Sequence, residues 1–84
     1  MWFVYLLECS DEHKSLYCGI TNDLEKRIAN HNLGKGAKYT KTRLPVKLYW
    51  FEESIDRSSA SKREYQIKRL SREKKLALKN PSSN

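Results

Sequence analysis

Three apolar runs separated by polar segments occupy the first two thirds of the chain. Residues 2–8 (WFVYLLE) are almost continuously apolar, and residues 16–20 (LYCGI) follow a polar segment, SDEHKS. Apolar runs of this length, rich in aromatic and β-branched residues, are typical of strands. Two such runs joined by a short polar loop predict a β-hairpin. Residues 46–52 (VKLYWFE) predict a third strand.

Alternation within the first run predicts which side chains share a face of the sheet. Successive side chains of a strand point to opposite faces. The expected sets are Phe3, Tyr5 and Leu7 on one face, and Trp2, Val4 and Leu6 on the other. Because both sets are apolar, both faces of the sheet are expected to be covered.

Capping residues and periodicity predict three helices. The first covers residues 23–32, after the capping oxygens of Thr21, Asn22 or Asp23, and ends near Gly34. The second follows Asp56 or Ser58 and continues to about residue 70, and the third covers residues 72–79. Arg27 and His31 are four residues apart, so they lie along one edge of the first helix.

This order, ββαβαα, predicts the α+β class, with a small three-stranded antiparallel sheet flanked by helices. One domain is expected over residues 1–80, followed by a frayed tail at 81–84. Residues 34–45 (GKGAKYTKTRLP) are expected to form a loop. Loops this long in a small domain tend to be functional.

Charge and cysteine content narrow the expected partners and location. The formal net charge of +7 points to a polyanion, and nucleic acid is the first such partner to consider. No apolar run is long enough to span a bilayer, and the final predicted helix is too poor in apolar residues to insert into a membrane surface, so no membrane partner is expected. Cys9 and Cys18 are too few for a secreted disulfide scaffold of this size. We therefore expect both to be reduced and the protein to be cytoplasmic.

Glu64 and Arg27 are the charged residues whose positions most need explanation. Glu64 lies on the apolar stripe of the second main helix, between Ala60 and Ile67. A carboxylate there is costly unless it is paired or bound to a metal. It is therefore either a metal ligand or one half of an ion pair with a neighbouring Lys or Arg. Arg27 is likewise either an ion-pair partner, for instance of Glu64, or a fork-shaped donor for a phosphate.

The remaining candidates each have an ordinary structural alternative. Tyr5, Tyr17 and His31 could simply be packed side chains with satisfied polar atoms, and Gly19 marks either a bulge or a close approach of the backbone to a ligand. Basic residues of the 34–45 loop and the second main helix could form solvated faces or contact phosphates; they are Lys35, Lys38, Lys41, Arg43, Lys68 and Arg69. Tyr39, within the basic loop, could stack on an unpaired base.

Several other kinds of site are not indicated. The cysteines and histidines do not have zinc-ligand spacing. The segment GKGAK does not follow a strand and open a helix as a phosphate-binding glycine loop does. No Ser-His-Asp set is apparent either.

Taken together, these residues resemble the GIY-YIG nuclease superfamily, and in particular its small bacterial members of endonuclease type. The resemblance extends from Trp2 to about Leu78. The matching positions are Phe3-Val4-Tyr5 and Tyr17-Cys18-Gly19 for the two signature triplets, Leu24, Arg27 and His31 on the following helix, and Glu64 on the second main helix.

The resemblance implies metal-dependent cleavage of phosphodiester bonds in DNA. It makes Tyr5 the general base or water activator and assigns Tyr17 to positioning the water or the scissile phosphate. Arg27 would stabilise charge on the phosphoryl oxygens, and Glu64 would hold one divalent cation, magnesium or alternatively manganese. His31 would help the Tyr5 hydroxyl to give up its proton, because free tyrosine, with a pKa near 10, is a poor base at neutral pH.

Two differences from the excision-repair members of the superfamily keep a second interpretation open. Those members have a lysine directly after the second triplet and an asparagine twelve residues after the glutamate, where this chain has Ile20 and Leu76. The alternative is a nucleic-acid-binding module, for DNA or RNA, with weak or no catalysis. No protein partner is indicated by the residues themselves, although enzymes of the superfamily commonly carry a separate recognition domain.

Overall fold

The computed structural model describes residues 1–78, and it has the predicted α+β architecture. The elements are β1 (Trp2–Glu8), β2 (Leu16–Thr21), α1 (Leu24–Asn32), α2 (Lys38–Lys41), β3 (Lys47–Ser54), α3 (Arg57–Lys68) and α4 (Arg72–Leu76). The short helix α2 lies inside the segment predicted to be a loop. The predicted tail at 81–84 lies outside the described residues, as does the last predicted residue of the final helix.

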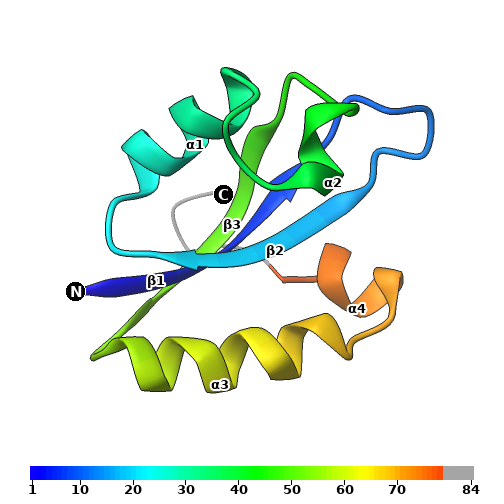
Figure 1. The fold of residues 1–84 in the computed structure, drawn as a ribbon. Helices are drawn as coiled ribbons and strands as arrows, with labels where there is room; N and C mark the ends of the chain where they lie inside the picture. The colour runs from blue at the N-terminus through cyan, green and yellow to red at the C-terminus, as the bar shows by residue number, and fades with distance from the viewer. Residues whose placement is uncertain (79–84) are drawn as a thin grey trace.

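The sheet is antiparallel and has the strand order β2-β1-β3. The predicted hairpin of β1 and β2 is confirmed, and its register places Tyr5 opposite Gly19. On its other side Tyr5 lies opposite Phe51 of β3. Figure 1 shows α1 and α2 on one face of the sheet, α3 and α4 on the other, and β2 along the edge nearest the viewer.

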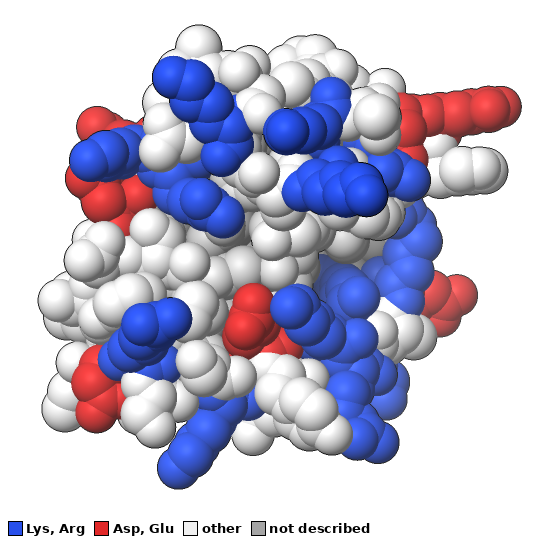
Figure 2. Space-filling model, viewed as in Figure 1, with Lys and Arg blue, Asp and Glu red and all other residues white. Residues whose placement is uncertain are grey.

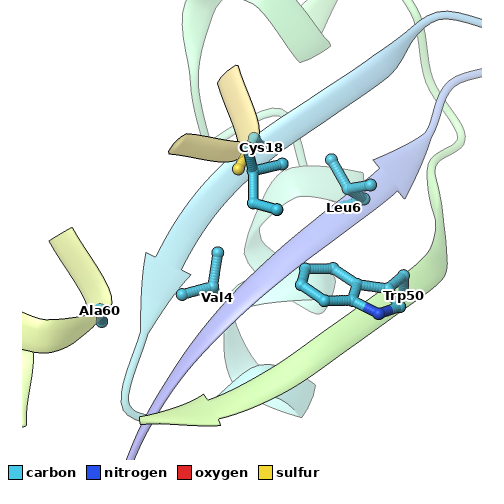
Figure 3. Close-up of a cluster of buried hydrophobic side chains, with 6 residues drawn as sticks. Val4, Leu6, Cys18, Trp50 and Ala60 are labelled. Atoms are coloured by element: carbon cyan, nitrogen blue, oxygen red, sulfur yellow. The ribbon is translucent and has the colours of Figure 1, made fainter. Parts of the chain in front are cut away.

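Two apolar clusters, one on each face of β1, confirm the predicted alternation. Beneath α3 the buried residues are Val4, Leu6, Cys18, Trp50, Ala60 and Ile67. Figure 3 shows the members of this cluster on the three strands, with Ala60 on the helix beside them. Beneath α1 they are Tyr5, Leu7, Cys9 and Val46, with Leu24 and Ile28 packed against them. Full burial of one such side chain contributes roughly 1.5–3 kcal/mol, so both helices are held to the sheet.

The helix ends also follow the sequence. The side chain of Asp23 accepts a hydrogen bond from the Lys26 amide at 3.1 Å, and Asp56 caps α3 through the Ser59 amide at 2.8 Å. After α1 the chain turns at Gly34, whose φ of +79° is strained for other residues. Each of these residues lies next to the helix end that it defines, so the sequence alone predicts these ends.

One side chain ties the end of α1 to the start of β3. The Asn32 amide nitrogen donates to the Val46 carbonyl at 3.0 Å, and the Val46 amide donates to the Asn32 side-chain oxygen at 2.7 Å. This pair of hydrogen bonds closes the segment that contains α2 and holds it against α1.

Both cysteines are free, and both are buried. Within residues 1–78, none of the helices has the length and apolar character needed to cross a membrane.

Candidate active site

The hydroxyl of Tyr5 lies between two functional groups of α1. Its oxygen is 3.2 Å from Nε2 of His31, and Nε of Arg27 donates to it at 3.4 Å. Tyr5 is 1% exposed and His31 is fully buried. The spacing of Arg27 and His31 on one edge of α1, predicted from the sequence, brings both side chains to the same phenol oxygen.

Thr40 determines which nitrogen of His31 carries the proton. Its hydroxyl donates to the Ala37 carbonyl at 2.9 Å and lies 2.8 Å from Nδ1 of His31. A hydroxyl whose only proton is directed to a carbonyl can act only as an acceptor toward the imidazole. His31 therefore carries its proton on Nδ1, and its Nε2 is left free to accept the proton of the Tyr5 hydroxyl.

The pKa shifts agree with this direction of hydrogen bonding. Burial raises the pKa of Tyr5, and the hydrogen bond and charge of Arg27 only partly oppose this effect. Burial, and then the positive charge of Arg27, lower the pKa of His31. At neutral pH the phenol is thus protonated and the imidazole is neutral, which are the states required for a donor and an acceptor.

Two glycines make room for these rings. A Cβ at position 19 would lie 2.5 Å from the Tyr5 hydroxyl and 2.7 Å from Cζ, and a Cβ at position 36 would overlap the imidazole of His31. Neither glycine needs a positive φ, so in both cases the requirement is space. The structure shows a third role for Gly19, which was expected to mark a bulge or a close approach to a ligand: its backbone lies against the Tyr5 ring.

Tyr17 extends the site outward from the buried pair. Its ring centroid is 5.3 Å from that of His31 and 6.5 Å from that of Tyr5. On the outer side it stacks on Tyr39 at 6.1 Å, and the Arg43 guanidinium lies 3.9 Å from the centre of the Tyr39 ring. The Tyr39 ring predicted to stack on a base is therefore already in contact with two side chains.

Glu64 lies on the opposite side of the edge strand from His31. Its carboxylate is 3.2 Å from the Lys68 ammonium and is partly buried, with 23% of its side chain exposed. Burial, followed by the nearby Glu64 carboxylate, raises the pKa of Cys18 to about 12, which locates the carboxylate beside β2. Figure 2 shows an acidic group near the centre of this face of the molecule, with basic groups beside it.

Within residues 1–78, therefore, hydrogen bonds and ring contacts join Tyr5 to Tyr17, Arg27 and His31, but none of them joins Glu64 to this group. The ion pair considered between Arg27 and Glu64 does not form in this part of the chain; Glu64 pairs with Lys68 instead. A link between the two halves remains, because Lys68 and Tyr17 line the same cavity, of about 270 Å³.

The predicted nucleic-acid-binding residues have different environments. Lys35, Lys38 and Lys41 are exposed on and before α2. Arg43 is held by Tyr39 and by an ion pair with Asp11 at 3.6 Å. Arg69 lies apart from the site, since it donates to the exposed Tyr65 hydroxyl at 2.8 Å.

The donor set around Glu64 restricts the kind of metal that it could hold. Among the described residues no group of three or more His, Cys, Asp or Glu side chains is close enough to form a protein-only site. Magnesium fits a single carboxylate, because it keeps several waters and takes its remaining ligands from substrate phosphates. The partly buried Glu64 carboxylate, which already attracts the Lys68 ammonium, is suited to that arrangement.

Sequence reasoning did not identify Thr40 and Gly36. Both belong to the 34–45 segment, which was noted for its charge and its tyrosine. A weak signal was present, because a second glycine two residues after Gly34 is not needed to end a helix. The contact of Thr40 with His31 depends on how α2 folds back onto α1, and no local pattern indicates it.

Comparison with known proteins identifies the family of this chain. A family model described as the GIY-YIG catalytic domain matches residues 1–77. The UPF0213 protein YsiG of Lactococcus lactis subsp. lactis is 55% identical over 78 residues, which cover 92% of this chain and 73% of that protein. The UPF0213 protein CPE1444 of Clostridium perfringens is 56% identical over 78 residues, covering 93% of this chain and 82% of its own.

A solved structure is also similar. It is the solution NMR structure of the UPF0213 protein BH0048 from Bacillus halodurans, which is 43% identical. The match covers 89% of this chain and 79% of that one, with a TM-score of 0.52. These matches agree with the resemblance seen in the signature triplets.

Proposed function

Because the chain belongs to the GIY-YIG family, whose catalytic domain implies nuclease-like chemistry on nucleic acid, we propose that it is a divalent-metal-dependent endonuclease that hydrolyses phosphodiester bonds in DNA. The observation that carries this proposal is the Tyr5 hydroxyl, held between Nε of Arg27 and Nε2 of His31. A buried phenol with a neutral base on one side and a fixed cation on the other is suited to activating water beside a phosphate.

His31 supplies the basicity that Tyr5 lacks. Since burial raises the pKa of Tyr5, the phenol does not ionise alone near neutral pH. It can take a proton from the attacking water while its own proton passes to Nε2 of His31. The water oxygen bonds to phosphorus, the bond from phosphorus to one sugar oxygen breaks, and solvent protonates that oxygen. General acid–base transfer of this kind typically contributes about 10²- to 10⁴-fold to a rate.

Arg27 stabilises the negative charge that develops on the phosphoryl oxygens. Its guanidinium stays charged, and only Nε is used in the hydrogen bond to Tyr5. The remaining donors can therefore bind a phosphate beside the phenol, where preorganised charge is most effective. Tyr17, which lies against both Tyr5 and His31, positions the phosphate or the water at the mouth of the site.

Glu64 would hold the divalent metal, magnesium or manganese, on the α3 side of β2. When bound, the metal would supply Lewis-acid stabilisation of the phosphate. We place the protein in the cytoplasm because both of its cysteines are free and buried, and we infer no membrane partner.

Cleavage assays with two pairs of variants test this function. Purified protein is incubated with single-stranded, duplex, flap and branched DNA in magnesium or manganese. Tyr5→Phe and Glu64→Gln should each lower cleavage by about 100-fold or more. Tyr65→Phe and Glu73→Gln, which change the same groups at exposed positions, should cleave like the wild type.

A second candidate function is favoured by the Glu64–Lys68 ion pair, which is the structural alternative to a metal ligand. In that case the protein would bind DNA or RNA with little turnover. Binding without cleavage of any of the DNA substrates would support it. Cleavage that persists undiminished in Tyr5→Phe or Glu64→Gln would instead overturn the assigned mechanism.

A further inference from the structure

A groove follows the outer edge of β2, between α2 and α4, and it begins beside Tyr17. Two adjoining cavities form it. The first, of about 270 Å³, is lined by Leu16, Tyr17, Cys18, Tyr39, Lys68 and Lys75. The second, of about 170 Å³, is lined by Ser15, Leu16, Tyr39, Arg72 and Lys75. Because Leu16, Tyr39 and Lys75 line both, the two are continuous; we call them together the β2 groove.

The charge of the β2 groove suits a chain of phosphates. Arg72 and Lys75 contribute positive charge to its lining, and neither forms an ion pair within residues 1–78. Lys68 lines the inner cavity and is paired with Glu64. Figure 2 shows basic side chains gathered above and below the β2 edge, with a hollowed surface between them. Two uncompensated cations in a groove that begins beside Tyr17 would hold phosphates adjacent to the reactive one.

Aromatic side chains form one wall of the same groove. Tyr17 and Tyr39 stack at 6.1 Å with an interplanar angle of 25°, and Tyr39 is 42% exposed. In single-strand binding sites cations usually follow the backbone and bases contact aromatic rings; here Tyr39 supplies the exposed ring, and Tyr17 behind it is partly buried. The chemistry of the groove therefore favours unpaired nucleotides.

Hydrogen bonds hold α4, which forms one wall of the groove, to the rest of the fold. The Tyr49 hydroxyl donates to the Leu76 carbonyl and ties α4 to β3. Nη1 of Arg72 donates to the Lys14 carbonyl at 3.1 Å, which ties the start of α4 to the hairpin loop. Arg72 keeps further donors free, so its role in holding the wall does not prevent contact with a phosphate.

We propose that the β2 groove binds a single strand of nucleic acid, with phosphates on Arg72 and Lys75, leading away from the bond cleaved at Tyr5 and Arg27. The inference rests on the proposed function and specifies its substrate class as DNA with an unpaired segment next to the scissile bond. The aromatic wall favours a single strand over a duplex, because the bases of a single strand are free to contact rings whereas those of a duplex are paired and stacked.

Binding without metal tests the groove separately from catalysis. Fluorescence anisotropy is measured in EDTA with a labelled oligodeoxythymidylate of about 15 nucleotides and with a duplex of similar length. The variant Arg72→Ala/Lys75→Ala should lose about 10-fold or more in affinity for the single strand, as expected for a lost charge-assisted contact. The matched variant Lys62→Ala/Lys74→Ala removes the same charge from residues that line neither cavity, and it should bind nearly as the wild type does.

Equal losses in the two double variants would overturn the inference, since charge alone would then explain binding. So would a loss confined to the duplex. Because Arg72→Ala also removes a hydrogen bond to Lys14, thermal melts accompany each measurement, and Lys75→Gln provides a single change that leaves that bond intact. Wild-type binding by Lys75→Gln and by a folded double variant would also contradict the proposal.

The outcomes distinguish this inference from the proposed function. If no DNA is cleaved but the groove variants still lose single-strand affinity, the nuclease proposal fails and the groove remains. If DNA is cleaved and the groove variants bind and cleave flap DNA like the wild type, the groove fails and the nuclease proposal remains.

Discussion

The direction of the Tyr5–His31 hydrogen bond depends on Thr40, a residue that contacts neither the water nor the phosphate in the proposed reaction. Because Thr40 donates to Ala37, it must accept from Nδ1 of His31, and this leaves Nε2 as the acceptor for Tyr5. One buried hydroxyl thus gives a buried histidine a defined tautomer, with Nε2 as an acceptor. The arrangement also explains why Gly36 is needed, since a side chain there would displace the imidazole.

The pH dependence of cleavage should report the protonation of His31. Burial and the charge of Arg27 lower its pKa below the ordinary value of about 6.5. Activity should therefore be complete above that value and be lost as the pH falls through the lowered pKa, where the imidazole becomes charged and can no longer accept a proton. In the same window the unfolded chain binds more protons at this position, so the free energy of unfolding should also fall on acidification. Rate–pH profiles and denaturation at several pH values measure both effects.

Thr40→Val separates this proton path from simple packing. Valine keeps the shape of threonine but removes the acceptor for Nδ1, so the other tautomer should be favoured and cleavage should fall about 10-fold or more. Thr40→Ser should restore the activity. The ¹⁵N chemical shifts of the His31 ring report the tautomer directly, and unchanged shifts in Thr40→Val would show that Thr40 does not control it.

Helix α2 and the segment around it place Thr40, and Asn32 holds that segment closed. The side-chain amide of Asn32 forms hydrogen bonds with both main-chain groups of the buried residue Val46, which would otherwise lack these partners. The segment was predicted to be a loop because glycines, a proline and charges interrupt any periodic pattern there. Its helical turn forms where the chain packs on α1, so local propensity does not reveal it.

Asn32→Ala should lower the free energy of unfolding by about 2 kcal/mol, because it leaves two main-chain groups of Val46 without their partners. Urea denaturation measures this change, and Asn22→Ala, in an exposed turn, should change stability by less than about 0.5 kcal/mol. If the two variants are equally stable, Asn32 does not hold the segment.

Across the molecule, the two halves of the proposed site lie on opposite sides of the edge strand β2. The phenol, base and guanidinium belong to the α1 face, and the Glu64 carboxylate belongs to the α3 face. β2 carries Tyr17 toward one half and Cys18 toward the other, since its side chains alternate. A substrate lying along this edge would meet both halves.

The net charge of +7 predicts how affinity depends on salt. Each phosphate contact with a single strand contributes a log–log slope of about −0.7. With the groove and the α2 lysines engaged, three or more contacts should give a slope of about −2 or steeper. Anisotropy titrations in EDTA over a range of salt concentrations measure the slope. Affinity that hardly changes with salt would exclude a mainly phosphate-based interface.

Local sequence patterns were enough to predict the strands, their two faces and the helix caps. They also predicted that Arg27 and His31 lie on one edge of α1. These features depend on residues a few positions apart, where strand and helix geometry are predictable. Only the tertiary structure showed that Thr40 contacts His31 and that Lys68, among several nearby cations, is the partner of Glu64. The groove between α2 and α4 is likewise a product of packing. Such contacts depend on how whole elements pack against one another, and side chains distant in the chain meet only when the sheet and its helices are assembled.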